Sequence, residues 1–294
     1  MSDSVCAVVV THNRLALLRE CLAALAAQER PVDEVLVIDN ASTDGTAEAL
    51  GTEFPEVRVR RLEHNGGGAG GFHAGMRDAH ARGFDWLWVM DDDTVPTPRA
   101  LERLLAAGAT RPGGRPPAIL ASRVVWTDDR LHPKNLPFPR TDAGHREALV
   151  DAAGRGLLLI RAATFVSILV HRRAIDAHGL PHAHYFIWGD DGEFTARVLR
   201  DEPGYLVPDS VVHHKTAAKE SVFQSGPQYY YELRNKLFML RGDSWVGREK
   251  LSLAVGAAAG LVEYLRRNKL APAALATVGR ALRDGLRGDP GGRR

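Results

Sequence analysis

Apolar residues along the first hundred positions follow two alternating patterns, which predict strands and helices in turn. Val5–Val10 is an unbroken apolar run rich in valine, as in a strand that is buried on both faces. Leucines then recur at helical spacing and predict an amphipathic helix, at Leu15, Leu18, Leu22 and Leu25. Further strands are predicted at Glu34–Asp39, Val57–Leu62 and Trp86–Met90. This rhythm favours an α/β fold in which helices flank a mostly parallel sheet.

The pattern loosens in the second half of the chain. Thr127–Glu147 is a long polar segment with prolines, a type of loop that often serves as a lid or as the wall of a substrate site. From about Tyr229 onward the sequence predicts helices, interrupted at Pro272. We therefore expect an α/β domain over residues 1–240 and a basic helical extension over residues 241–294.

The composition is that of an ordinary globular protein, with 294 residues, 45% hydrophobic and 25% charged. The net charge of +2 is unevenly spread, because 11 Lys/Arg stand against 5 Asp/Glu from Arg241 to the end. This balance argues against a general nucleic-acid binder. It allows the tail to lie near an anionic membrane surface.

Several features favour a cytoplasmic location. The longest apolar run, Leu251–Val262, is too short to span a bilayer, and the N-terminus lacks the basic region of a signal peptide. Cys6 and Cys21 stand in apolar contexts and are expected to be reduced core residues. We expect a cytoplasmic protein whose tail can contact the inner face of the cell membrane.

Three aspartates, Asp91, Asp92 and Asp93, directly follow the predicted strand Trp86–Met90. Ligands of open parallel sheets bind beyond the carboxyl ends of the strands. On an extended chain Asp91 and Asp93 point the same way, so they can hold one Mg²⁺ or Mn²⁺ while Asp92 points elsewhere. The alternative is a solvated acidic turn that precedes the next helix.

A glycine-rich stretch, His64–Gly75, places six glycines in twelve residues between a strand and a helix. Glycine lets the backbone approach a ligand closely, and the start of the helix favours an anion. The stretch therefore predicts one wall of a nucleotide-sugar site. The alternative is a flexible turn.

Two adjacent carboxylates, Asp190 and Asp191, follow aromatic residues in the segment His184–Phe194. An apolar surround raises the pKa of a carboxyl group, which makes it a better general base. The alternative is structural, with Asp190 as the N-cap of a helix and Glu193 as its capping-box partner. Both can hold, because Asp191 would remain free.

Two histidines, His213 and His214, leave a predicted strand about twenty residues later. Neighbouring side chains on an extended chain face opposite sides, so at most one of them should reach the metal. The alternative is that both are surface or packing residues.

These pieces, in this order, resemble family-2 glycosyltransferases of the GT-A fold. The matching stretches are AVVVTHNR, VIDNASTDGT and MDDD. A closer likeness, to actinobacterial galactofuranosyltransferases and related rhamnosyltransferases, depends on HNGGGAGGFHAGM, WLWVMDDD, YFIWGDDGEF, HHK and YYYELRN. It covers roughly residues 5–240. The chain departs from these relatives in HNGGGAGG, where they commonly have a leucine after the asparagine, and in the glycine of WGDD.

The resemblance implies roles for individual residues. Asp91 and Asp93 would hold Mn²⁺ or Mg²⁺ with His214, or with His213 as second choice. Asp191 would be the catalytic base and Trp188 a platform for the sugar, and Asp39 or Asn40 would bind the base, expected to be uracil. The residues assigned to the nucleotide-sugar are Thr11, His12, Asn13, Arg14, Asp39, Asn40, Asn65, Gly66, Gly67, Gly70, Asp92, Trp188 and Asp190.

The implied function is metal-dependent, inverting transfer of galactofuranose from UDP-galactofuranose. The implied acceptor is a hydroxyl of a polyprenyl-diphosphate-linked or cell-envelope glycan. One alternative is a rhamnosyltransferase that uses dTDP-rhamnose, and another is a non-catalytic protein that binds sugar nucleotides. An NAD-dependent oxidoreductase is disfavoured, because the glycines follow the third predicted strand and not the first.

Overall fold

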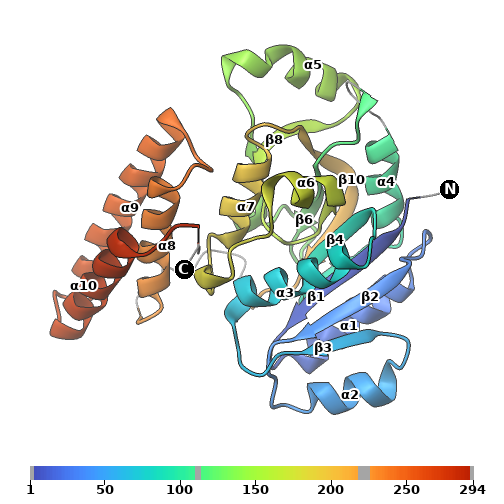
Figure 1. The fold of residues 1–294 in the computed structure, drawn as a ribbon, viewed down its shortest axis with the longest axis horizontal. Coiled ribbons are helices and arrows are strands. Elements are labelled where there is room, and N and C mark those ends of the chain that lie inside the picture. The colour runs from blue at the N-terminus through green and yellow to red at the C-terminus, as the bar shows by residue number, and fades with distance from the viewer. Residues whose placement is uncertain (1–2, 110–113, 218–225, 292–294) are drawn as a thin grey trace.

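The computed structural model describes residues 3–109, 114–217 and 226–291. An α/β body carries a helical unit at its C-terminal end (Figure 1). Residues 292–294 of the predicted extension lie outside the described residues. Within the described ranges, no helix combines the length and apolar character needed to cross a bilayer.

The elements follow one another along the chain much as the apolar pattern predicts. The strands are β1 (Val5–Thr11), β2 (Glu34–Asp39), β3 (Arg58–Arg61), β4 (Trp86–Asp91), β5 (Thr94–Pro96), β6 (Ile119–Val125), β7 (Phe138–Pro139), β8 (Leu158–Ala162), β9 (Ile168–His171) and β10 (Gly204–His214). The helices are α1 (Leu15–Ala26), α2 (Thr46–Glu53), α3 (Gly67–Ala81), α4 (Ala100–Ala109), α5 (Arg146–Gly154), α6 (Arg172–His178), α7 (Asp190–Val198), α8 (Tyr229–Arg241), α9 (Gly247–Arg267) and α10 (Pro272–Arg287). Short 3₁₀ turns are η2 (Pro133–Asn135), η3 (Ala143–His145) and η4 (Ala183–Tyr185).

One mixed sheet forms the centre of the body, in the order β3-β2-β1-β4-β9-β6-β10-β8-β7, with β5 paired to β10. The first four strands in this order are parallel, as expected from the sequence. Beyond them, β9 runs antiparallel between β4 and β6, and β8 runs antiparallel beside β10. β6 and β10 again pair in parallel, and among the described strands β5, β8 and β9 run against the others, so the sheet is mixed but mostly parallel, as expected. Short apolar runs such as β6 and β9 look the same in either direction, which is why sequence pattern does not show that β9 is reversed.

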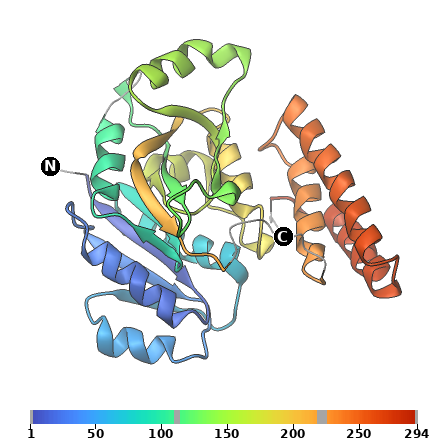
Figure 2. The ribbon, with the colours of Figure 1, turned by 180° about the vertical axis from the view of Figure 1, so that it is seen from behind.

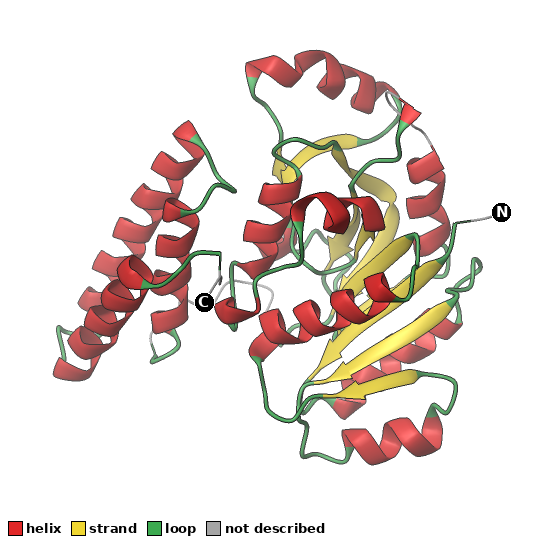
Figure 3. Ribbon diagram, in the orientation of Figure 1, coloured by secondary structure: helices red, strands yellow, loops and turns green. Residues whose placement is uncertain are grey.

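Helices cover both faces of the sheet (Figure 3). The side chains of β1 alternate between two hydrophobic clusters, one shared with Leu18 of α1 and the other with Met76 of α3. Gly71 and Gly75 bring α3 against the sheet, because a Cβ at either position would lie 2.4 Å from a methyl of Val10 or Val8. Two of the six glycines in the glycine-rich stretch are thus required by helix–sheet packing.

The C-terminal helices α8, α9 and α10 pack against one another (Figure 2). Their shared core consists of Tyr229, Leu233, Tyr264, Ala274, Val278 and Ala281. The predicted interruption at Pro272 is confirmed, because α10 begins at this residue. Proline fits the first position of a helix, where a backbone N–H would have no partner within the helix. The α8 helix precedes residue 241, yet it packs with the helices of the predicted extension. An ion pair joins this unit to the body, with Arg161 Nε 2.8 Å from Glu249 Oε1.

Candidate active site

A cleft of about 1490 Å³ opens where β1, β4 and β10 end. Most of the predicted site residues line it: Thr11, His12, Arg14, Asn40, Asn65, Gly67, Asp91, Asp92, Asp93, Trp188, Asp190, Asp191 and His214. Four others, Asn13, Asp39, Gly66 and Gly70, are not among the described residues of this lining. The cleft therefore gathers residues that are as far apart in sequence as Thr11 and His214.

Asp91, Asp93 and His214 meet in this cleft. Each offers one ligand atom, and these atoms lie within 4.8 Å of one another. The meeting depends on the antiparallel pairing of β5 with β10, which places His214 opposite Thr94, directly after Asp93. His213 points away and contacts Asp129, with Nε2 2.8 Å from Oδ1. Of the two histidines, only His214 is beside the aspartates.

The orientation of His214 suits a cation. Its Nδ1 lies 2.8 Å from Asn135 Oδ1, and Asn135 Nδ2 donates to Thr164 Oγ1 at 2.9 Å, which fixes the amide as an acceptor toward the ring. With the proton on Nδ1, a lone pair on Nε2 faces Asp93 Oδ1 at 3.1 Å, and no described residue donates a hydrogen bond to that oxygen in this state. Two acceptors this close need a proton or a cation between them. The donor set therefore fits a divalent metal ion, with Asn135 supporting the imidazole from behind.

The charges around the three aspartates are only partly balanced. Burial, with Asp93 and then Asp92 adding to it, raises the pKa of Asp91 well above its usual range. Burial also raises the pKa of Asp93, but the contacts with His214 and Arg14 outweigh it and the pKa is lowered. Arg14 Nη1 lies 2.8 Å from Asp93 Oδ2, and it is half exposed. Arg14 alone does not balance the charge of three aspartates, and a divalent cation would supply the missing positive charge.

Asp92 lines the same cleft, and its Oδ1 lies 3.5 Å from the Arg14 Nη1 atom that also contacts Asp93. Its Oδ2 accepts a hydrogen bond from Thr11 Oγ1 at 2.7 Å, and Asp92 is almost fully buried. Burial raises the pKa of Asp92 to about 6. Asp92 thus joins the ends of β4 and β1 and helps to fix the floor of the cleft.

The side chains of Asn40 and Asp39 differ in which of their polar atoms are already hydrogen-bonded. Asn40 Oδ1 accepts from Gly66 N at 2.9 Å, and its Nδ2 donates to Gly67 O at 2.8 Å, so the side chain holds the glycine-rich turn. Asp39 Oδ1 accepts from Ser42 N, whereas its Oδ2 has no hydrogen-bond partner among the described residues and lies 3.5 Å from Arg61 Nε. Asp39 is fully buried and lies outside the described lining of the cleft, whereas Asn40 lines it.

The two carboxylates of α7 occupy its first turn. The expected N-cap role of Asp190 is wrong, because Gly189, with φ 84°, makes the turn and Asp190 is already helical. The expected partner, Glu193, instead accepts from Arg197 Nε at 2.8 Å and from Ser244 Oγ at 2.5 Å. Burial raises the pKa of both aspartates, and the neighbouring Asp191 raises that of Asp190 further. Asp190 is buried, while Asp191 is partly open to the cleft.

The lining also contains residues that sequence analysis did not single out. Asn135 and Lys134 come from the polar segment that was predicted to form a wall, so a signal for them existed. Glu232 and Lys236 come from α8. Glu232 belongs to the YYYELRN stretch, but no spacing rule could connect either residue to the ends of β1 and β4, which lie more than a hundred residues earlier.

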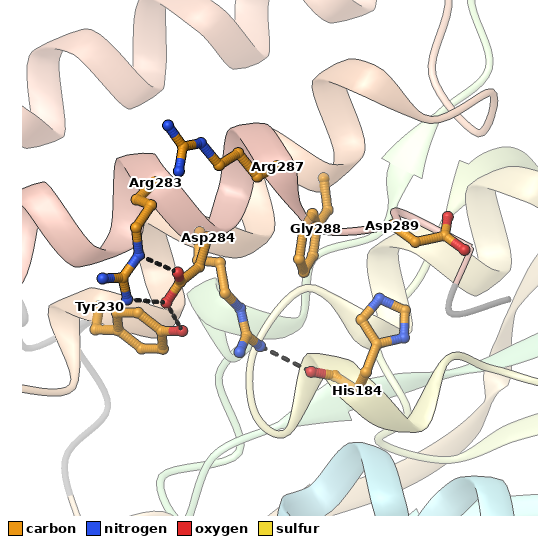
Figure 4. Close-up of a pocket in the computed structure, with 9 residues that line it drawn as sticks. His184, Tyr230, Arg283, Asp284, Arg287, Gly288 and Asp289 are labelled. Atoms are coloured by element: carbon orange, nitrogen blue, oxygen red, sulfur yellow. Dashed lines mark hydrogen bonds and ion pairs between the residues drawn. The ribbon is translucent and has the colours of Figure 1, made fainter. Parts of the chain in front are cut away.

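A second hollow, of about 590 Å³, lies between α8, α10 and η4 (Figure 4). Its charged groups are largely satisfied by one another, since Asp284 accepts from Tyr230 Oη at 2.8 Å and from Arg283 Nε at 2.8 Å. None of the predicted site residues lines it. The chemistry-bearing residues are concentrated in the larger cleft.

Comparison with known proteins bears on this cleft. The profile of glycosyl transferase family 2 matches residues 6–162, more than half of the chain, including Asp91 and Asp93. The chain belongs to this family. The resemblance inferred from the sequence motifs is confirmed.

Curated family-2 relatives share about a third of their matched residues with the chain. Galactofuranosyltransferase GlfT1 of Mycobacterium tuberculosis (strain ATCC 25618 / H37Rv) is 36% identical over 210 residues, which are 68% of this chain and 66% of the relative. GlfT1 of Mycolicibacterium smegmatis is 34% identical over 209 residues, with the same coverage. The N-acetylglucosaminyl-diphospho-decaprenol L-rhamnosyltransferase of Mycobacterium tuberculosis (strain ATCC 25618 / H37Rv) is 28% identical over 249 residues, 73% of this chain and 77% of that protein. The chain thus spans just under two thirds of the length of the two GlfT1 proteins.

Solved structures confirm the fold. The structure of S. aureus TarS 1-349 aligns with 96% of this chain and 80% of its own, with a TM-score of 0.63 and 16% identity. GalNAc-T7, solved with UDP, GalNAc and Mn²⁺, aligns with 81% of this chain and 48% of its own, with a TM-score of 0.61 and 16% identity. At this identity the likeness concerns the fold alone, and it is the GT-A arrangement expected from the sequence.

Proposed function

We propose that this family-2 protein transfers a sugar from a nucleoside-diphosphate donor to an acceptor hydroxyl, with inversion at the anomeric carbon. The observation that carries the proposal is that one cleft contains both the Asp91–Asp93–His214 donor set and the carboxylate pair of α7, Asp190 and Asp191. A protein that only bound sugar nucleotides would need no group able to take a proton from an acceptor. The retained pair therefore counts against the non-catalytic alternative.

Asp191 is the proposed base. Its Oδ1 accepts from its neighbour Gly192 N at 2.6 Å, which orients the carboxylate, and burial raises its pKa and so its affinity for a proton. Asp191 takes the proton of the acceptor hydroxyl, whose oxygen forms a bond to the anomeric carbon as the bond to the diphosphate breaks. A single displacement of this kind inverts the centre and leaves no sugar on the protein. Asp91, Asp93 and His214 would hold Mn²⁺ or Mg²⁺, which when bound stabilises the departing diphosphate.

The proposed donor is UDP-galactofuranose, because the two GlfT1 relatives are named galactofuranosyltransferases. The rhamnosyltransferase relative supports dTDP-rhamnose as the second candidate. The name of that relative contains a decaprenol diphosphate, which supports a polyprenyl-diphosphate-linked glycan as acceptor. In this proposal Thr11, His12 and Arg14, at the end of β1, bind the nucleotide, and Trp188 contacts the sugar.

Thermal unfolding with UDP- and dTDP-sugars, each with and without Mn²⁺, tests the donor. A donor present at about 100 times its Kd should add about 2.7 kcal/mol to the free energy of unfolding. We expect UDP-galactofuranose to stabilise the protein only with Mn²⁺, and Asp93→Asn to lose this effect. Stabilisation by dTDP-rhamnose alone would favour the second donor. If no nucleotide-sugar stabilises the protein, with or without Mn²⁺, the proposed function falls.

We also propose peripheral contact between α9 and an anionic membrane. Leu251, Val255 and Val262 lie on α9 and are 66%, 61% and 66% exposed, and no charged residue occurs between Leu251 and Val262. Basic residues outnumber acidic ones on both sides of this stripe, with Arg248 and Lys250 against Glu249 before it, and with Arg266, Arg267 and Lys269 against Glu263, which pairs with both arginines, after it. An apolar stripe between basic ends is typical of helices that lie in a membrane interface.

Sedimentation with anionic vesicles at low salt tests the contact. Leu251→Glu combined with Val255→Glu should abolish binding. Val150→Glu is a matched control, because Val150 is 71% exposed but lies on α5. Absence of wild-type binding, or equal loss in the control, would refute the contact at this helix.

A further inference from the structure

The segment that leads into α7 has an unusual backbone. Phe186 and Trp188 have φ values of 65° and 64°, and Gly189 has 84°. Phe186 is the centre of a tight γ-turn, closed by Ile187 N donating to Tyr185 O at 2.8 Å. Residues other than glycine rarely adopt positive φ values, so the surrounding structure must hold the segment in place.

Two neighbouring side chains of α8 bind this segment. Asn235, 1% exposed, has its Nδ2 at 3.0, 2.8 and 2.8 Å from the carbonyl oxygens of Tyr185, Ile187 and Trp188. Arg234 Nη2 lies 2.9 and 2.7 Å from the carbonyl oxygens of His184 and Tyr185. Figure 4 shows His184 with its carbonyl bonded in this way. Four carbonyls of one short segment thus depend on two residues.

The amide of Asn235 is itself fixed. Arg234 Nε donates to Asn235 Oδ1 at 2.9 Å, so the oxygen is occupied and the NH₂ group must face the segment. Because an NH₂ group has two hydrogens, three carbonyls at hydrogen-bond distance use its full donor capacity. No other described side chain donates to the carbonyls of Ile187 and Trp188.

The opposite side of the segment rests on the glycine-rich start of α3. Ala69 N donates to Phe186 O at 3.1 Å. A Cβ on Gly67 would lie 2.0 Å from that same oxygen, so only glycine fits there. The segment is therefore held between α3 and α8, and it carries Trp188 and Asp191 into the cleft.

We propose that Asn235 and Arg234 are positioning residues for transfer, acting from outside the reacting groups by holding the segment 184–189. The proposal rests on the proposed function of the cleft. It gives a role to the end of the YYYELRN stretch, whose Arg-Asn pair sequence analysis left unassigned. Loss of the pair should let Phe186 and Trp188 relax to ordinary angles. That relaxation would displace Asp191, while the donor set formed by β4 and β10 would stay in place.

The test compares Asn235→Ala and Arg234→Ala with Arg241→Ala. Arg241 is a matched control on the same helix, because its Nη1 also donates to two backbone carbonyls. These carbonyls belong to Gly285 in α10 and to Gly288 just after it, and not to the segment 184–189. We expect kcat per UDP-binding site to fall by about 100-fold in Asn235→Ala, as for a misplacement of about 1 Å. The Kd for UDP with Mn²⁺ should stay within about twofold of the wild-type value, because the residues proposed to bind the nucleotide and the metal lie outside the segment 184–189. Arg241→Ala should keep both values, and Arg234→Lys should recover only part of the loss because lysine lacks the planar fork.

Hydrogen exchange gives a second readout that needs no activity. Amides of residues 184–192 should exchange about tenfold faster in Asn235→Ala, with residues 86–93 unchanged. Unchanged exchange in 184–192, or a loss of UDP binding equal to the loss of kcat, would overturn the positioning role. If the wild-type protein transfers no sugar from any donor, the proposed function fails, and exchange still decides whether the pair holds the segment.

Discussion

Replacing Gly71 by alanine tests how closely α3 lies against the sheet. The new Cβ would lie 2.4 and 3.2 Å from the two methyls of Val10, whereas carbon atoms in contact are normally about 3.5–4.0 Å apart. Val10 is buried in β1 and branched at Cβ, so it cannot swing aside, and the helix must shift by roughly 1 Å. Overpacking costs typically about 1–3 kcal/mol, partly offset by the ~0.5–1 kcal/mol that alanine gains in a helix. We expect a net loss of about 1–2 kcal/mol in the free energy of unfolding.

Gly70→Ala is the matched control, because a Cβ at this neighbouring helical position meets no atom within 4 Å. The same substitution should there leave stability unchanged or raise it by up to about 1 kcal/mol. Equilibrium urea unfolding of both variants measures the two free energies, and titration with UDP and Mn²⁺ follows binding. Equal stability changes in the two variants, or a stabilised Gly71→Ala protein, would refute the packing role of Gly71.

Three further predictions concern the cleft. Asp191→Asn should lower kcat by about 10²–10⁴-fold with UDP binding retained, and wild-type turnover in this variant would remove the role of base. Asn135→Ala should weaken Mn²⁺ binding by about 10–100-fold in calorimetry, because it frees the ring of His214, whereas Asn268→Ala, in a helix cap far along the chain, should not. Burial raises the pKa of Asp190, so the folded state holds this proton more tightly than the unfolded state does. Wild-type stability should therefore fall as pH rises above about 4, and urea unfolding of Asp190→Asn should show a flatter pH dependence.

Most of the first half of the fold was predictable from local spacing. The apolar runs of β1, β2 and β4 and the leucines of α1 follow from rules that act within a few residues, and the structure agrees with them. The start of α7 was not predictable in the same way. The capping pattern at Asp190 is a valid local signal, but Gly189 can adopt a positive φ and moves the turn one residue earlier.

The candidate site shows the same division between local and distant information. That Asp91 and Asp93 share a side, and that His213 and His214 do not, follows from the alternation of side chains along an extended chain. Which histidine faces the aspartates depends on the pairing of β5 with β10, between segments more than a hundred residues apart. Asn135, which orients His214, comes from a loop that no spacing rule connects to either strand.

By itself the sequence determined most strands and helices of the first half of the fold and the residue types that carry the chemistry, because backbone periodicity and side-chain character are local properties. Only the tertiary structure decided the reversed direction of β5, β8 and β9, the choice of His214, and the binding of the segment 184–189 by Asn235. Those outcomes depend on which distant surfaces can bury apolar area and satisfy buried carbonyls together. Such a condition belongs to the whole chain and cannot be read from any one stretch of it.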